Sequence, residues 1–273
     1  MEMNLTVLIT ASFCKFHPSL IIISKALLSL RYLHLKYGTD VLLFHDRPPR
    51  IEMKFDLYIR NLNHSMLSIC ECIQNIQPRL VLTNQHMHQA KALEFALSLV
   101  KTEFFLKMEH DHVFVRRILV YEILYDMMHD HNLKIVRFNR RQNEIVNCDS
   151  GYYTNREKKR ISRRLWKEYK SVSQTYTRTV CFSDMNHISR LPFYTHTIAS
   201  PAAKKAPQMI ETTIQPLVVN NHTMFGTYIY GAPGFNKTLS HLDASRHNHG
   251  ELDHNRIAKI RAQPVWNKFF CTK

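Results

Sequence analysis

The sequence predicts an α/β protein in which a mixed, mostly parallel β-sheet is flanked by helices. Short apolar stretches alternate with longer amphipathic stretches through the first half of the 273-residue chain. The short stretches are almost continuously apolar, which is typical of strands covered on both faces. Polar residues directly follow several of them, and in such sheets ligands bind at the carboxyl ends of the strands. We therefore expect one large α/β domain with its functional site at that edge of the sheet.

The first half divides into alternating strands and helices. The stretches with the length and composition of strands are 5–11, 40–45, 80–83, 104–111 and 133–138. The stretches predicted to form helices between them are 19–37, 63–76, 87–100 and 116–131. Pro18 suits the start of the first helix, and Gly38 suits its end.

The second half is less regular. Residues 155–170 are basic and are predicted to form a helix with a solvated face, a nucleic-acid-binding patch being the alternative. A strand is expected over 179–186, a helix over 203–220 and a short aromatic strand over 226–231. The tail from 240 to 255 is dense in His, Asp and Glu.

The composition is that of a folded, basic protein. With 45% hydrophobic and 22% charged residues, the chain is not expected to be disordered. Its net charge of +15 favours phosphate-bearing partners, although general solubility explains it equally well. The 6 cysteines show no zinc-binding or disulfide framework, so we expect them to be reduced. No stretch reaches the roughly 20 apolar residues that span a bilayer, and no signal peptide is evident, so a cytoplasmic protein without a transmembrane segment is expected.

The most informative motif is the tetrapeptide from Glu109 to His112, which ends an apolar stretch. Side chains alternate along a strand, so Glu109 and Asp111 are expected on the same face. Carboxylates are costly to bury unpaired, and a divalent cation that holds a phosphate-bearing substrate would offset their charge. The alternative is an ordinary polar strand end.

Residues 104–112, Phe-Phe-Leu-Lys-Met-Glu-His-Asp-His, resemble the strand and acidic motif of nucleotide-sugar-dependent glycosyltransferases of the GT-A type. The resemblance extends over the β/α order from 5 to 138 and touches 226–231 and 241–243. Glu109 stands where that family usually has its first Asp. The resemblance implies a single GT-A (Rossmann-like) domain over 1–273, with a nucleotide-sugar-binding half (1–139) and an irregular acceptor-binding half (140–273).

The resemblance also implies roles for individual residues. Asp111 would ligate a Mn²⁺ or Mg²⁺ ion that bridges the diphosphate, and Glu109 would face the ribose or support the metal through water. His241 would be a further metal ligand, drawn from near the C-terminus. The residues expected to contact the nucleotide follow the first two predicted strands: Thr10, Ala11, Ser12, Asp46 and Arg47.

Several of these assignments have alternatives. The Asp46-Arg47 pair is equally well explained as a surface turn before two prolines. Other residues of the tail compete with His241 as ligands: His247, His249, His254, Asp243 and Asp253.

An inverting transfer needs a general base to take the acceptor hydroxyl proton. Glu211 and Asp184 are the two candidates in the second half. Glu211 precedes an apolar helix-like run, the usual placement of the base in inverting members of this fold. Its alternative is a first-turn carboxylate favoured by the helix dipole. Arg190 is expected to bind acceptor hydroxyls or the diphosphate.

The leading prediction is a metal-assisted glycosyltransferase (hexosyl- or pentosyltransferase). It would move a sugar from a UDP- or GDP-sugar to a glycan or other hydroxyl acceptor, with inversion. The resemblance favours a viral or microbial source, and the host cytoplasm if viral. One alternative is a metal-dependent phosphohydrolase or nuclease, which needs more convergent acidic ligands than the first half offers. Another is a basic nucleic-acid-binding protein, but no motif supports it and we expect no stable nucleic-acid partner.

Overall fold

The computed structural model describes residues 3–12, 20–49, 53–73, 76–143, 167–179 and 182–242. Within these ranges, the strands of one large sheet are β1 (Leu5–Ser12), β2 (Thr39–Asp46), β3 (Ile76–Leu82), β4 (Phe104–Glu109), β6 (Ile135–Arg137), β7 (Lys167–Lys170), β8 (Thr175–Arg178), β9 (His187–Arg190) and β10 (Thr227–Tyr230). Their order across the sheet is β3-β2-β1-β4-β9-β6-β10-β8-β7. A separate two-stranded sheet pairs β5 (His112–Phe114) with β11 (Leu239–His241).

The helices of the described ranges are α1 (Ile21–Ser29), η1 (Leu30–Leu33), α2 (Met53–Ile73), α3 (Gln89–Ser98), α4 (Val120–His129), α6 (Leu191–Tyr194), η2 (Thr195–Ala199), α7 (Ser200–Ala203), α8 (Ile210–Asn220) and α9 (His222–Phe225). None of them is long and apolar enough to cross a membrane.

The large sheet is mixed and mostly parallel, as predicted. Strand β1 runs parallel to β2 and β4, and β2 runs parallel to β3. Strand β9 is antiparallel to both β4 and β6, and β8 is antiparallel to both β10 and β7. The carboxyl ends of β1, β2 and β4 therefore meet at one edge, while the carboxyl end of β9 lies at the opposite edge.

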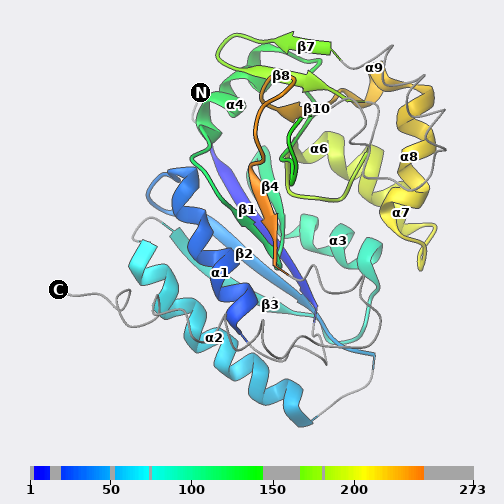
Figure 1. Ribbon diagram of the computed structural model, residues 1–273. Helices are drawn as coiled ribbons and strands as arrows, with labels where there is room; N and C mark the ends of the chain where they lie inside the picture. The colour runs from blue at the N-terminus through cyan, green and yellow to red at the C-terminus, as the bar shows by residue number, and fades with distance from the viewer. Residues whose placement is uncertain are drawn as a thin grey trace, which may run out of the picture.

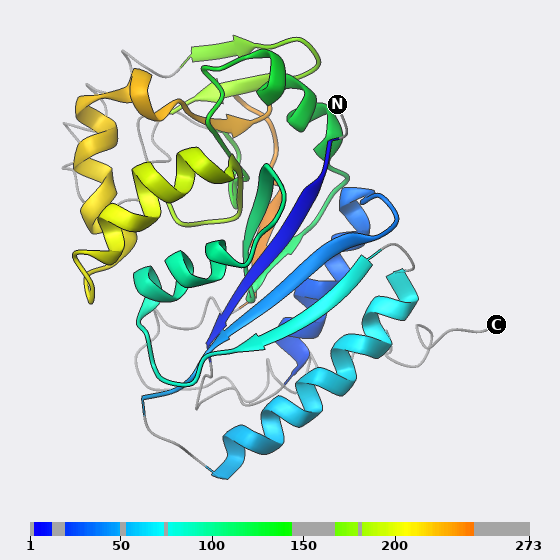
Figure 2. The same ribbon diagram turned by 180° about the vertical axis from the view of Figure 1, so that it is seen from behind.

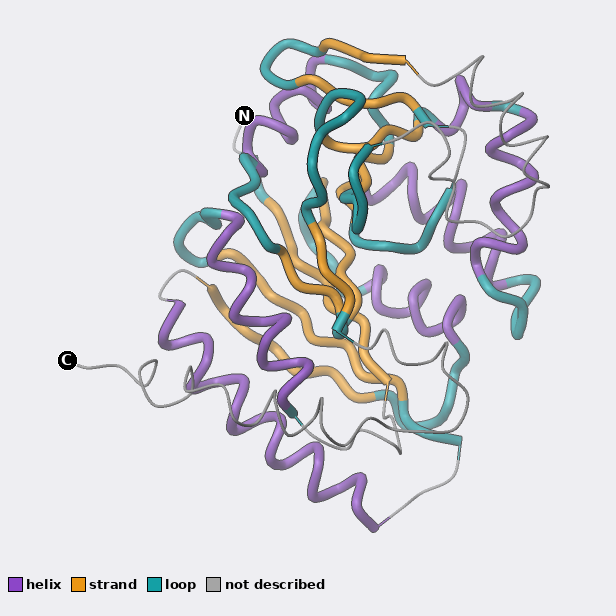
Figure 3. The backbone as a smooth tube through the Cα atoms, viewed as in Figure 1, coloured by secondary structure: helices purple, strands orange, loops and turns teal. Residues whose placement is uncertain are grey.

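Helices cover both faces of this sheet (Figure 1). Alternation along β1 sends Val7 and Ile9 into a core cluster with α1, α2 and α4, and Leu8 into a second cluster with α3, η2 and α8. Figure 2 views the sheet from behind, and Figure 3 shows the strands running between the two groups of helices. The predicted fold class, a sheet flanked by helices, is confirmed.

Element boundaries in the first half differ from the prediction in two helices. The helix expected over 19–37 stops earlier, because His34 adopts a left-handed conformation with φ of 47° directly after η1. Gly38, with φ of 78°, lies in the turn that leads into β2. The helix expected over 63–76 begins ten residues earlier, at Met53.

The second half differs more. Residues 167–170, predicted to be helical, form β7 and pair with β8 as a hairpin, while 155–166 lie outside the described residues. The strand expected over 179–186 lies later in the chain, as β9, because 182–186 form an irregular segment. The helix expected over 203–220 is interrupted by turns, and α8 begins only at Ile210. The aromatic strand predicted over 226–231 is confirmed as β10.

Candidate active site

Asp111 and His241 meet at the carboxyl end of β4. Strand β4 ends at Glu109, a turn follows, and β5 then pairs antiparallel with β11 so that His112 faces His241 in the register. The Nε2 atom of His241 lies 2.8 Å from Oδ2 of Asp111, and the backbone N–H of Leu242 donates to the Asp111 carbonyl at 2.9 Å. The small sheet therefore brings together two residues that the sequence predicted as metal ligands.

The residues around Asp111 suit a divalent cation. Asp111, His112 and His241 each offer a ligand atom, and these atoms lie within 4.8 Å of one another. Glu109, His110 and Asp111 form a second such group. Carboxylate oxygen combined with imidazole nitrogen is a donor set that fits Mn²⁺ and similar ions. The chemistry of these residues therefore fits the ion predicted from the sequence.

The protonation of this group also favours cation binding. Burial acts to raise the pKa of Asp111, but the hydrogen bond from His241 and the charges of His110 and His112 hold this pKa well below its usual range. Burial lowers the pKa of His112. Asn186 Oδ1 accepts from the backbone N–H of Glu109 at 3.0 Å and contacts His112 Nδ1 at 3.1 Å. His112 therefore donates from Nδ1, which leaves its Nε2 lone pair for a ligand.

The two carboxylates of the motif do not share a continuous strand, contrary to the sequence prediction. Thr10 of β1 pairs with Glu109, and the Thr10 carbonyl accepts from the N–H of His110 at 3.2 Å. Beyond that bond β4 has no strand neighbour within the described residues, so His110 and Asp111 form a turn. Glu109 and Asp111 are brought close by this turn instead of by strand alternation.

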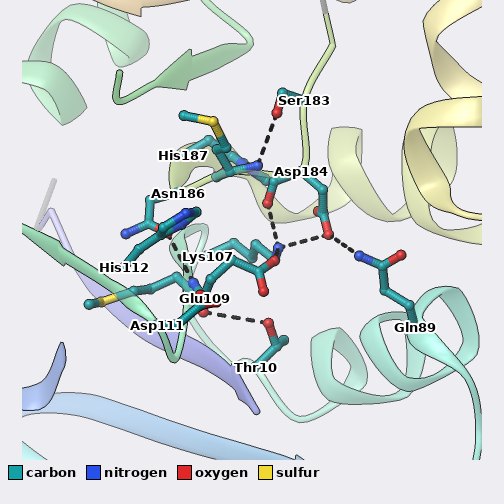
Figure 4. Close-up of polar contacts among 12 residues, drawn as sticks. Thr10, Gln89, Lys107, Glu109, Asp111, His112, Ser183, Asp184, Asn186 and His187 are labelled. Atoms are coloured by element: carbon teal, nitrogen blue, oxygen red, sulfur yellow. Dashed lines mark hydrogen bonds and ion pairs between the residues drawn. The ribbon is translucent and has the colours of Figure 1, made fainter. Parts of the chain in front are cut away.

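A buried lysine, missed by the sequence reasoning, lies beside this turn. Lys107 is 1% exposed, and its ammonium group contacts Glu109 Oε1 and lies 2.8 Å from Asp184 Oδ2. It also donates to the backbone carbonyl of Asp184, and Gln89 donates to Asp184 Oδ2 at 2.7 Å (Figure 4). The signal in the sequence was a lysine inside an otherwise apolar strand, since a buried ammonium requires acceptors.

The charges of this cluster are unbalanced. Burial acts to lower the pKa of Lys107, but the charges of Asp184 and Glu109 raise it above its usual value. Burial and the charges of Glu109 and Glu211 raise the pKa of Asp184 to about 8, against the opposing effect of Lys107. One ammonium thus faces two carboxyl groups, while Glu211 acts on Asp184 from nearby, and near neutral pH Asp184 retains a proton.

Both base candidates belong to the same cluster. Glu211 lies in the first turn of α8, and its Oε1 accepts from the backbone N–H of Asp184 at 2.9 Å. Asp184 is 3% exposed, whereas Glu211 is half-buried. Oε2 of Glu211 and Oδ1 of Asp184 are buried and have no hydrogen-bond partner among the described residues. The structure thus brings both carboxyl groups to the Lys107 side of the site without distinguishing their roles.

The predicted nucleotide contacts lie at the same edge of the sheet. Ser12 pairs with Asp46 across β1 and β2, and Thr10 and Ala11 precede Ser12 on β1. Arg47 follows Asp46, and its guanidinium donates to the carbonyl of Asn84 at 3.3 Å. Thr10 is therefore a direct neighbour of the Glu109–Asp111 turn, and the other residues lie at or just beyond the carboxyl ends of β1 and β2.

Asp46 is more than a surface turn, because it is 8% exposed and anchors the loop between β3 and α3. Its Oδ1 accepts from the hydroxyl of Thr83 at 3.1 Å and from the N–H of Met87 at 3.0 Å. Its Oδ2 lies 2.9 Å from Nδ1 of His86. The carboxylate is therefore occupied by this loop, which it holds at the edge of the site.

Arg190 does not fit its predicted role. It is the last residue of β9 and pairs with Phe104, at the opposite end of β4 from Glu109. Its guanidinium contacts Glu103 and the carbonyl of Met127, and lies 4.8 Å from the centroid of the Phe104 ring. Because β9 runs antiparallel to β4, its carboxyl end points away from the site. The competing ligands from Asp243 onward lie outside the described residues.

The sheet order and the position of this site define the GT-A fold. No model of a known protein family matches the sequence, and no curated protein matches it. A mannosyltransferase from Pyrobaculum calidifontis, solved with GDP-Man and Mn²⁺, superposes with a TM-score of 0.50 at 11% identity, over 89% of this chain and 58% of that chain.

Two other solved structures superpose with lower TM-scores. S. aureus TarS has a TM-score of 0.48 at 10% identity, over 84% of this chain. The CMP:2-keto-3-deoxy-manno-octonic acid synthetase complexed with CTP has a TM-score of 0.47 at 12% identity, over 97% of this chain and 99% of that chain. The present chain spans only 35% of the length of TarS.

Proposed function

We propose that this protein is a glycosyltransferase that moves a sugar from a UDP- or GDP-sugar to a hydroxyl group of a glycan or another acceptor. The observation that carries the proposal is the 2.8 Å contact between Asp111 and His241 at the carboxyl end of β4. Residues 130 positions apart meet there beside the predicted nucleotide contacts. In an α/β sheet this edge is where a substrate binds.

Asp111, His112 and His241 would hold a Mn²⁺ or Mg²⁺ ion, whose chemistry is to neutralise the departing diphosphate. Thr10, Ala11 and Ser12 of β1 would bind the nucleotide, together with Arg47 and the loop that Asp46 anchors. The donor would thus be held mainly by residues 1–139 and the acceptor by residues 140–273.

Glu211 is the better candidate for the base of an inverting transfer. A base must be unprotonated to accept the acceptor hydroxyl proton. Asp184 has a pKa raised to about 8, and its Oδ2 is occupied by Lys107 and Gln89. Glu211 uses Oε1 for the Asp184 N–H and keeps Oε2 without a partner among the described residues. We therefore assign proton removal to Glu211 and an orienting role to Asp184.

A ligand screen tests this function. The melting temperature is measured with UDP, GDP and other nucleoside diphosphates at millimolar concentration, with and without Mn²⁺. We expect one of them to stabilise the protein only when Mn²⁺ is present, and Asp111→Asn to abolish that shift. Asp40→Asn is the matched control, because Asp40 forms a pair with Arg79 at the far end of β2.

Hydrolysis of the matching nucleotide sugar is then scored in the same variants. If no nucleoside diphosphate changes the melting temperature, the proposal fails. Plasmid cleavage with Mg²⁺, lost in Asp111→Asn, would instead identify a nuclease.

A further inference from the structure

We propose that Lys107 is a positioning residue, an internal cation that holds Glu109 and Asp184 and thereby leaves Asp111 and His241 to bind the divalent ion. This inference rests on the proposed function, because it concerns the ion site of that activity. Figure 4 shows Lys107 between the carboxyl groups of Glu109 and Asp184.

The ammonium group of Lys107 is fully used by the protein. An ammonium group has three N–H donors. Its acceptors are Glu109 Oε1, Asp184 Oδ2 and the backbone carbonyl of Asp184. With 1% exposure and three acceptors, Lys107 is not available to a substrate. Its effect on the site must therefore act through the groups that it holds.

These contacts join the two halves of the chain. Lys107 belongs to β4, whereas Asp184 belongs to the irregular segment before β9. The backbone N–H of Asp184 in turn holds Oε1 of Glu211 at 2.9 Å. A continuous path of contacts thus runs from Glu109 through Lys107 and Asp184 to Glu211. The distance between the carboxylates of Glu109 and Glu211 therefore depends on Lys107, which lies between them in this path.

The two carboxylates of the motif differ in what an ion must displace. Oδ2 of Asp111 lies 2.8 Å from Nε2 of His241, and an ion can bind in place of that contact because both atoms are ligand types. Oε1 of Glu109 is held by a buried ammonium that Oδ2 and the backbone carbonyl of Asp184 fix in place. An ion can therefore bind both Asp111 and His241, whereas Glu109 can offer it at most one oxygen.

The neighbours of Lys107 are consistent with a permanent positive charge. His187 pairs with Lys107 across β9 and β4 and is fully buried. Burial and the charge of Lys107 lower the pKa of His187 to about 3, so this ring stays neutral. Lys107 is thus the cation that faces Glu109 and Asp184, and His187 adds no second positive charge.

The test is a double-mutant cycle on Mn²⁺ affinity, measured as free Mn²⁺ by electron paramagnetic resonance. Glu109→Gln is made in the unaltered protein and in a Lys107→Met/Asp184→Asn background, which removes the buried ion pair on both sides. We expect Glu109→Gln to weaken Mn²⁺ binding by less than about threefold in the unaltered protein and by about tenfold or more in the altered background, where Glu109 is free to face the ion. Asp111→Asn should weaken binding at least about tenfold in both.

Two outcomes overturn the inference while leaving the proposed function intact. Equal effects of Glu109→Gln in both backgrounds would show that Lys107 only fills space. An effect of Glu109→Gln as large as that of Asp111→Asn in the unaltered protein would make Glu109 a direct ligand. Circular dichroism checks folding, and if the altered background does not fold, the Glu109→Gln measurement in the unaltered protein still decides. Absence of Mn²⁺ binding to the unaltered protein would overturn both the inference and the proposed ion site.

Discussion

Replacing Lys107 by Met should destabilise the fold strongly, although the two side chains are similar in size. Lys107 is 1% exposed and compensates Asp184, which is 3% exposed. Above pH 8, where Asp184 is ionised, removing one partner of this buried ion pair leaves an uncompensated buried charge and costs about 3–5 kcal/mol. Urea denaturation followed by circular dichroism measures this as a fall in the free energy of unfolding. In a domain of this size it corresponds to a fall in melting temperature of about 10 °C.

Adding Asp184→Asn to Lys107→Met separates the effect of charge from the effect of packing. In Lys107→Met/Asp184→Asn the buried carboxylate is gone, so more than about half of the loss should be recovered. Lys170→Met is the control, because Lys170 is 77% exposed and lies 3.5 Å from Glu168. Its effect should stay within about 0.5 kcal/mol. The reasoning is refuted if Lys107→Met costs less than about 1 kcal/mol, or if its cost is the same with Asn at position 184.

Three further predictions concern the pH dependence of stability, the ion ligand His241 and the position of Arg190. The pKa of Asp184 rises on folding from 3.8 to about 8, so between these pH values the folded state holds more protons than the unfolded state. The free energy of unfolding should therefore fall as the pH rises through this window. Asp184→Asn should flatten this decline, which is measured by urea denaturation at pH 5 and pH 8. His241→Ala should weaken Mn²⁺ binding by about tenfold or more, whereas His129→Ala, on the exposed side of α4, should leave it unchanged. Arg190→Ala should lower the melting temperature through loss of its contacts with Glu103 and Phe104, yet leave nucleoside diphosphate binding intact; a selective loss of binding would restore Arg190 to the site.

Much of the first half was predictable because its pattern is regular. The apolar stretches became β1, β2 and β4, and the rule that ligands bind at carboxyl ends located the site. The second half was less predictable because tertiary pairing decides it. Residues 167–170 carry a charged sequence without a clear period, and only their pairing with β8 makes them a strand. The direction of β9, which removed Arg190 from the site, is likewise invisible in local sequence.

The site shows the same division between local and long-range information. Glu109 and Asp111 were identified from spacing, yet their proximity comes from a turn that forms where β4 runs out of neighbours. His241 was identified only by resemblance, and β11 places it by pairing with β5. Each residue was therefore recognisable by its chemical type, whereas its position depended on strand pairing that local patterns do not encode.

The role of Lys107 was predictable from the same energetics as the ion site. Carboxylates at a strand end need a cation, which can be a bound ion or a side chain. The sequence already contained such a side chain, two residues before Glu109, on a strand whose apolar neighbours predict burial. Side chains two apart on a strand share a face, so Lys107 and Glu109 were expected on the same side of the sheet, where the structure shows them in contact. A buried lysine next to an acidic motif therefore predicts that part of the acidic charge is already compensated, and that the ion prefers the carboxylate farther from it.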